Sequence, residues 1–489
     1  MSRIRVLLLC FLGAVFWVQN GQGQFTRHWN ESFSTKAALL SGAVVGGYAD
    51  ETSIYYNPSI LRDSNESSFT FSNGLVKIDM VRYENAMGDG LNVQNWEPTV
   101  ASGFISVGLY PKDQFGLVWK AAVFNKTNFD NSFSGEHRTE FDVYQNIPGN
   151  EQYLGKVSSR REYNDYWYGL GVAKSFNSRF SVGASFFARN SNLRYNARKQ
   201  VEVTALDTIE NRQMVSVNNS TSYIKGYCWR ATIKMGANYA LNDRVKLGLV
   251  FTSPSMFVFG SAEAASNISY VNVLNQDNTE FLPDYMYDEV GSNLGFKIKD
   301  PMSIAMGIDY RYNKFYRWNV TLEWFAGLKP YRFVDERKGD VKSTSTENVV
   351  EQDEFLSFAA GGNSILNIAV GMEKFLPNNR SWLFGFKTDF DALNNYDYKD
   401  LAPLNKLLNA KTDYYHFSAG KNFAFLNFDV LFGIEYSFSR AKNQPAFANF
   451  TPPIHVESET PYKLEGVQQN NMNFKGDAII LFVGLTLRK

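Results

Sequence analysis

The stretch MSIAMGIDYRY, residues 302–312, alternates between two kinds of side chain. Every second residue is apolar or aromatic: Met302, Ile304, Met306, Ile308, Tyr310 and Tyr312. The residues between them are small or charged: Ser303, Ala305, Gly307, Asp309 and Arg311. Successive side chains of a strand point to opposite faces, so this pattern predicts a strand with one apolar and one polar face. The same alternation runs through VKLGLVF (245–251), RWNVTLEWF (317–325) and AIILFVGLTL (478–487).

The polar faces of these predicted strands combine charged residues with Gly and Ala. The charges near strand centres are Lys120, Arg189, Arg230, Lys234, Asp309, Arg311, Glu323, Glu373, Lys387, Asp389, Asp429 and Glu435. A solvated face of a soluble sandwich can carry such charges but has less need of small residues. A barrel lumen needs both, because opposite charges pair inside it and small residues leave room for a plug or ligand. Trp, Tyr and Phe near the strand ends are typical of an aromatic girdle.

The connections between the predicted strands alternate between short and long. We expect strands at 69–82, 102–110, 115–124, 166–176, 180–194, 228–241, 245–257, 302–312, 316–325, 366–375, 382–390, 415–423, 428–438 and 478–488. Short turns are predicted at PKDQ (from 111), NSR (177), NDR (242), NKF (313), LPNNRS (376) and near Ala424. Long polar loops are predicted at 83–101, 125–165, 195–227, 258–301, 326–365, 391–414 and 439–477. The sequence therefore predicts an all-β, transmembrane, antiparallel up-and-down barrel of about 14 strands.

Composition and targeting signals narrow the class of protein. Lys plus Arg and Asp plus Glu both number 49, which gives no support to nucleic-acid binding. Residues 1–23 carry a basic start, an apolar run and small residues before Gln24, and so read as a secretory signal peptide. With Cys10 removed in that signal, Cys228 is alone, so no disulfide or cysteine metal site is expected. No run of 18 apolar residues follows residue 24, and hence no spanning helix is expected.

Residues 24–68 precede the strand series and predict a plug, or hatch, inside the barrel formed by 69–489. A lumen of this size would leak unless it were filled. The segment contains Gly47-Tyr48-Ala49-Asp50 and Ser53-Ile54-Tyr55-Tyr56-Asn57-Pro58-Ser59-Ile60-Leu61. This motif resembles the N-terminal signature of the long-chain fatty acid transporter (FadL-type) family, which includes toluene and other hydrocarbon porins. Ser59 and Ile60 depart from the usual Ala and Gly, and the chain lacks a terminal aromatic.

The resemblance implies a monomeric passive transporter in the bacterial outer membrane, inserted by the barrel assembly machinery and surrounded by outer-membrane lipid. Long-chain fatty acids or other hydrophobic compounds would pass through a hatch-gated barrel. The hatch and gating candidates are Asp50, Tyr55, Tyr56, Asn57 and Pro58. The ligand-binding candidates are Phe187, Arg189, Arg230, Lys234 and Arg311, where the cations would hold a carboxylate head group.

Other functions remain open at this level. The alternative is a FadL-type barrel that serves protein secretion of the type IX kind, as an accessory or shuttle component, and the long loops at 125–165 and 258–301 would suit that use. The sequence has no GxSxG elbow, and its four histidines share no ligand spacing. We therefore expect no enzyme activity, no metal, no cofactor and no nucleic-acid partner.

Overall fold

The computed structural model describes the greater part of the chain. The described residues are 27–29, 32–48, 50, 52–63, 70–99, 103–109, 116–144, 147–207, 212–274, 280–346, 354–393, 407–408, 410–425, 428–451 and 464–487. The predicted signal peptide 1–23, Ala49 of the motif, the turn at 111 and residues 426–427 of the turn near Ala424 lie outside them.

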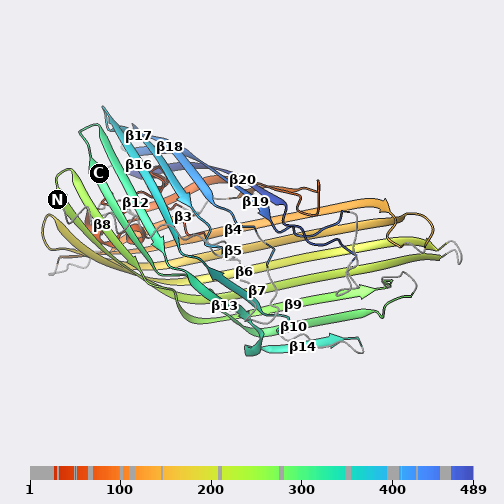
Figure 1. The fold of residues 1–489 in the computed structure, drawn as a ribbon. Helices are drawn as coiled ribbons and strands as arrows, with labels where there is room; N and C mark the ends of the chain where they lie inside the picture. The colour runs from red at the N-terminus through yellow and green to blue at the C-terminus, as the bar shows by residue number, and fades with distance from the viewer. Residues whose placement is uncertain are drawn as a thin grey trace, which may run out of the picture.

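The described residues form 20 strands, all joined in one sheet (Figure 1). The strands are β1 (Thr70–Glu84), β2 (Val93–Thr99), β3 (Gly103–Leu109), β4 (Leu117–Phe141), β5 (Glu151–Ser175), β6 (Phe180–Asp207), β7 (Arg212–Asn242), β8 (Val245–Thr252), β9 (Met256–Val271), β10 (Tyr285–Phe296), β11 (Ser303–Arg311), β12 (Tyr316–Phe325), β13 (Leu328–Asp335), β14 (Asp340–Ser345), β15 (Phe358–Gly362), β16 (Ile365–Leu376), β17 (Arg380–Asp389), β18 (Tyr414–Phe425), β19 (Phe428–Gln444) and β20 (Met472–Leu487). Helical turns are α2 (Thr35–Leu39), α3 (Ser53–Tyr56), η1 (Pro58–Asp63) and η2 (Glu336–Lys338).

Within the described residues, 14 of these strands pair in a closed antiparallel ring. Their order around the ring is β1, β3, β4, β5, β6, β7, β8, β11, β12, β16, β17, β18, β19 and β20, which pairs again with β1. Each predicted strand corresponds to one strand of this ring. The predicted antiparallel barrel of about 14 strands is thus confirmed, and closing the ring leaves its backbone groups paired on both sides.

Three of the short turns share one local mechanism. The side-chain oxygen of Asn177 accepts hydrogen bonds from the backbone N–H groups of Arg179 and Phe180, both at 2.8 Å. Asn242 and Asn313 accept the same pair of bonds from the residues two and three positions later, at 2.8–3.0 Å. An Asn that bonds the backbone ahead of it closes a tight turn. The predicted turn chemistry at these three positions is confirmed.

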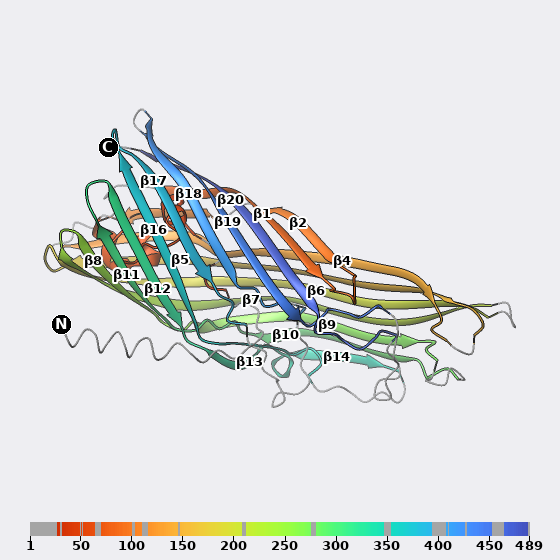
Figure 2. The same ribbon diagram turned by 45° about the horizontal axis from the view of Figure 1, so that its top comes forward.

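The prediction of long loops is wrong for most of the chain between the barrel strands. Strands β4–β7 continue far beyond the barrel, and β9, β10 and β14 extend the same sheet (Figures 1 and 2). We call the part formed by 126–141, 151–165, 190–207, 212–228, β9, β10 and β14 the extension sheet. The supposed loops 125–165, 195–227 and 258–301 are therefore largely strand. Shorter strands β2, β13 and β15 also replace parts of predicted loops.

Apolar residues cover the outside of the ring and one face of the extension sheet. Exposed residues on the ring strands include Ile105, Val107, Leu170, Phe186, Met235, Leu249, Met306, Ile308, Phe384, Phe432, Ile434 and Leu481. Two buried cores form against the inner face of the extension sheet, one centred on Tyr153 and Phe450 and the other on Ile224 and Phe358. No helix of the described residues is long and apolar enough to cross a bilayer.

Candidate functional site

The described residues between 27 and 63, here called the N-terminal segment, contact the inner faces of ring strands from several sides. Glycines on those strands allow its backbone to approach closely. A Cβ built on Gly248 or Gly307 would lie within 3.0 Å of the backbone of Val45 or Gly46. Gly248 and Gly307 are register partners on β8 and β11, so the two glycines form one shallow seat for this backbone. The small residues of the polar faces therefore accept the chain's own segment.

The Asn57-Pro58 turn has a seat of the same kind. Gly236 faces the Asn57 side chain, and Gly183 faces the Pro58 carbonyl. The Asn57 amide is fully buried: its nitrogen donates to the Val45 carbonyl at 2.8 Å, and its oxygen accepts from the N–H and hydroxyl of Ser59. A buried amide with donor and acceptor both used locks the two halves of the segment together.

Asp50 is also held within the segment. Its carboxylate accepts from the Ser34 hydroxyl at 2.7 Å and from the backbone and hydroxyl of Thr52 at 2.8 and 2.5 Å. Ser34 in turn caps α2 by accepting from the Ala37 N–H at 2.9 Å. Asp50 therefore connects α2 to the turn before α3.

Tyr55 lies at the centre of an aromatic cluster that joins the segment to β4, β5 and β6. Its ring centroid is 4.9 Å from Phe33, 5.5 Å from Phe124, 5.6 Å from Trp167 and 6.5 Å from Phe187. Most of these contacts are edge-on, the favoured geometry for aromatic pairs. This packed cluster, with Tyr56 partly buried against it, is the apolar side of the candidate site.

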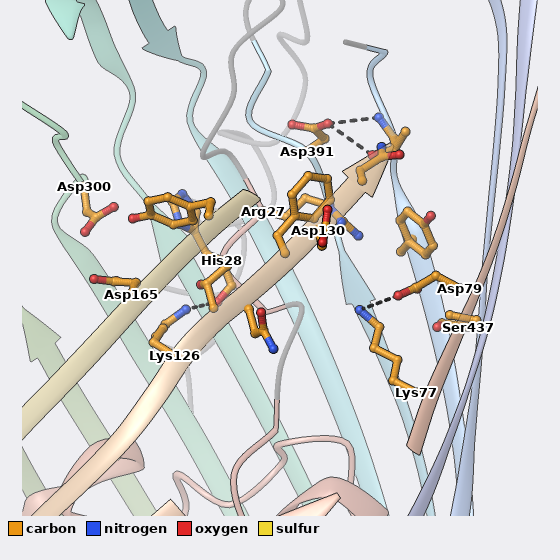
Figure 3. A pocket seen from close by; sticks show the side chains of 18 of the residues that line it. Arg27, His28, Lys77, Asp79, Lys126, Asp130, Asp165, Asp300, Asp391 and Ser437 are labelled. Atoms are coloured by element: carbon orange, nitrogen blue, oxygen red, sulfur yellow. Dashed lines mark hydrogen bonds and ion pairs between the residues drawn. The ribbon is translucent and has the colours of Figure 1, made fainter. Parts of the chain in front are cut away.

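A cavity with about 1800 Å³ of space not filled by atoms, part of it open to solvent, lies next to this cluster (Figure 3). Tyr55, Trp167 and Phe325 give it an apolar side. The rest of its wall is strongly charged, with Arg27, Lys77, Lys126, Arg161, Arg189 and Lys234 facing Asp79, Glu97, Asp130, Asp165, Asp300, Glu323 and Asp391. The cavity wall is therefore amphipathic rather than uniformly apolar.

Two predicted ligand-binding residues, Arg189 and Arg230, neutralise two carboxylates at this cavity. Both guanidinium groups contact both Asp165 and Asp300, with Arg230 at 3.2 Å and 2.7 Å. The Ser191 hydroxyl donates to Asp165 at 2.7 Å. Burial opposes ionisation of Asp300, but the guanidinium groups of Arg189 and Arg230 outweigh it and hold its pKa below the ordinary value. The four groups form a closed, neutral quartet.

Lys234 has a different environment. Its Nζ lies 4.0 Å from the centroid of the Tyr55 ring, and its side chain is 5% exposed at the cavity wall. Among the described carboxylates, none lies within 4.0 Å of its ammonium group. The cation is therefore held by a ring face and is available to an anion in the cavity.

Arg27 and His28 line the same cavity, and Trp29 beside them anchors this part of the segment. The Trp29 backbone N–H donates to Asp389 at 3.0 Å, and its indole N–H donates to Glu323 at 2.6 Å. His28 stacks on Phe325 with centroids 4.4 Å apart, and its carbonyl accepts from Lys126 at 3.0 Å.

The structure brings together Tyr55, Phe187, Arg189, Arg230 and Lys234 of the predicted site residues. Arg311 lies elsewhere: it is exposed at the short-turn end of β11, where its N–H donates to the Arg244 carbonyl. Sequence reasoning missed four residues at the site: Lys126, Asp165, Trp167 and Asp300. All four fall within or at the edges of supposed loops, and only a charge-balance argument for the buried arginines would have predicted the two acids.

Solved structures with this architecture were found in a structural comparison. The Pseudomonas putida toluene transporter TodX aligns with 95% of this chain and 100% of its own at a TM-score of 0.51 and 11% identity. A TodX deltaS2S3 mutant, a monoaromatic hydrocarbon channel, aligns with 93% of this chain and 99% of its own at 0.53 and 12% identity. The chain has the TodX fold. The FadL-type resemblance is thereby confirmed for the fold. No protein-family model and no curated protein sequence matches the chain.

Proposed function

We propose that the protein is a passive transporter of hydrophobic or amphiphilic molecules in the bacterial outer membrane. A band of apolar side chains around a closed ring suits a bilayer, and a charged interior suits a lumen. In this proposal residues 1–23 are a signal peptide, 24–68 are the hatch, and 69–489 form a barrel that acts as a monomer. The barrel assembly machinery would insert it. The fold shared with TodX supports transport, whereas the structural neighbours support no enzyme activity.

The observation that carries the proposal is an aromatic wall at one cavity beside Lys234, a cation that has no ion-pair partner among the described carboxylates. Tyr55 and Trp167 offer apolar surface, and Lys234 stands over the Tyr55 ring. An amphiphile with an anionic end would place its chain along the rings and its head group at Lys234. Arg189 and Arg230 are already neutralised by Asp165 and Asp300, so we assign them a structural role in the cavity wall.

Gating in this proposal is movement of the N-terminal segment. Arg27 and His28 line the cavity, and the backbone near Val45 packs against the ring, so in this proposal a solute passes only when the segment is displaced. Asp50, Asn57 and Pro58 would move with it as one unit, since hydrogen bonds join them to its other turns.

A binding assay with labelled oleate and a long-chain alkane tests this assignment. Lys234→Met should weaken oleate about tenfold or more, in keeping with loss of one charge-assisted contact, and should leave the alkane unchanged. Arg311→Gln is the matched control, because that cation lies away from the cavity. Equal losses for both ligands would remove Lys234 as the head-group residue, and no binding of either would overturn the transport proposal.

A second candidate function is an accessory or shuttle role in protein secretion of the type IX kind. The extension sheet favours it, because a polar sheet projecting beyond the barrel presents a large surface to a protein. Crosslinking in whole cells from a residue on that sheet distinguishes the two: a single specific protein adduct, lost together with secretion on deletion of the barrel, would favour this role.

A further inference from the structure

The outer faces of β5–β7 carry a boundary between apolar and polar residues. At this boundary the exposed Tyr168 ring lies 6.0 Å from Trp229, which lies 6.2 Å from Phe259. The other aromatic limit is Phe176, which directly follows β5 at the short-turn end, eight residues from Tyr168. A tilted strand of that length rises roughly 20 Å, close to the roughly 25 Å height of the apolar band of a membrane barrel. Tyr168 and Trp229 therefore mark one edge of this band.

The same outward faces continue beyond this edge into the extension sheet. Strand pairing aligns Glu162, Arg194 and Lys225 in one row, Arg160, Asn196 and Tyr223 in the next, and Ser158, Arg198 and Thr221 in a third. In β5–β7, as far as these strands are described, the three rows contain four cations and a single acid. The cations are Arg160, Arg194, Arg198 and Lys225, and the acid is Glu162.

Three of these four cations are free to contact a ligand. The exception is Arg160, which forms ion pairs with Asp130 and Glu162 at 3.0 and 2.9 Å. The Arg194 side chain is 67% exposed and only 4.0 Å from Glu162, which is already shared. Arg198 and Lys225 are exposed, and neither has an ion-pair partner among the described carboxylates. Within the described chain, Arg198 donates only from its Nε, to the Asn219 side chain at 3.3 Å. We call Arg194, Arg198 and Lys225 the basic face.

Glu263 limits this excess, because it is exposed and is the register partner of Lys225 on β9. No ion pair joins these two side chains at the 4.0 Å limit in the described chain. The flanking acids Asp130 and Glu263 therefore border the basic face, and its centre on β6 stays positive.

The position of the basic face identifies its partner. The first row, with Arg194 and Lys225, lies six residues beyond Tyr168 along β5 and four beyond Trp229 along β7. For tilted strands that is roughly 10–15 Å beyond the band edge, and Arg198 lies four residues farther along β6. Long Arg and Lys side chains bend back toward the interface from such positions. We propose that Arg194, Arg198 and Lys225 bind the phosphate groups of anionic lipid in the surrounding outer leaflet. This inference rests on the membrane placement given under Proposed function, but not on the transported ligand.

Phosphate fits these residues better than a carboxylate-bearing protein surface does. Arg recognises phosphate oxygens with two parallel N–H donors, and Lys adds a point charge. Each basic residue near an anionic lipid surface adds about 1 kcal/mol, which is a factor of about five in binding. Continuity with the apolar band means that lipid already contacts these strands directly below.

The test measures lipid binding to the full-length protein by native mass spectrometry. The probes are lipid A, which carries two phosphates on a diglucosamine, and the same lipid without its phosphates. The wild-type protein should prefer the phosphorylated form. The triple variant Arg194→Gln, Arg198→Gln, Lys225→Gln should lose that preference by tenfold or more, while binding the dephosphorylated form as before. Added inorganic phosphate should compete only weakly, since it lacks the lipid that holds the head group in place.

Two further variants keep the inference falsifiable. Arg138→Gln removes a 70% exposed cation near the far end of β4 and should leave lipid preference unchanged. Replacing Arg194 and Arg198 by Lys retains charge and should keep most of the preference, even if the triple variant folds poorly. A full preference in the folded triple variant, or an equal loss in Arg138→Gln, would overturn the inference. A protein that shows the lipid preference but binds no oleate would refute only the transport proposal.

Discussion

Replacing either glycine of the seat, Gly248 or Gly307, should release the N-terminal segment while leaving the ring intact. A methyl group on Gly248 would overlap the Val45 carbonyl, so the segment backbone must move away by about 1 Å. The strand backbone has no such freedom, because β8 pairs with β7 on one side and β11 on the other. The segment is therefore the part that yields.

The cost follows from the contacts that such a movement breaks. Overpacking of a close-packed site costs about 1–3 kcal/mol. The Gly46 carbonyl accepts a bond at 2.8 Å from the buried side chain of Asn238 on β7, and this bond joins the segment to the ring. Leaving this bond unmade costs a further 1–3 kcal/mol or so. A total of about 3 kcal/mol raises the population of the displaced segment more than 100-fold.

Small-solute leakage through liposomes or planar bilayers measures that population. Gly248→Ala and Gly307→Ala should increase leakage toward that of a variant lacking residues 25–61. Gly295→Ala is the control, since the atoms nearest its new methyl group belong to the Lys338 and Asp335 side chains and not to the N-terminal segment. If Gly248→Ala is folded and as tight as the wild type, the segment is not locked through Val45, and its assignment as the hatch loses its main support.

Three further results are expected. Trp29→Phe keeps an aromatic ring at this position but removes the 2.6 Å hydrogen bond to Glu323. The free energy that anchors the N-terminal segment should fall by about 1.5–3 kcal/mol, so proteolysis should cut the segment sooner. Asp165→Asn breaks the buried quartet around Arg189 and should lower the free energy of unfolding by about 3–5 kcal/mol in a denaturant titration. Burial lowers the pKa of His28 to about 4, below its unfolded value near 6.5. The anchoring of His28 should therefore be complete above pH 6.5 and weaken by up to about 3 kcal/mol as pH falls toward 4. Titration of the His28 ring by NMR and solute leakage measured against pH would both test this, and His28→Asn should remove the pH dependence.

The ring strands were predictable because their two faces have different surroundings. The outer positions carry exposed apolar side chains and the inner positions are small or polar, so the alternation is visible in the sequence. In the extension sheet this contrast is interrupted: in SSRR at 158–161, Ser159 and Arg161 are buried while Arg160 is exposed, although the residue types repeat. A stretch whose two faces are both polar in sequence looks like a loop, and such stretches led to the wrong prediction of long loops.

The site was predictable only where a local motif fixed it. Asn57 and Tyr55 could be singled out because turn chemistry and the family-like motif lie within a few adjacent residues. The state of the arginines could not, because their charge balance depends on Asp165 and Asp300, which are 135 positions apart in the chain. Alternation shows that Arg189, Arg230 and Lys234 all point inward, but it does not show which cation is already paired. Pairing depends on the tertiary structure, and for that reason we propose Lys234, rather than the arginines, as the contact for a ligand head group.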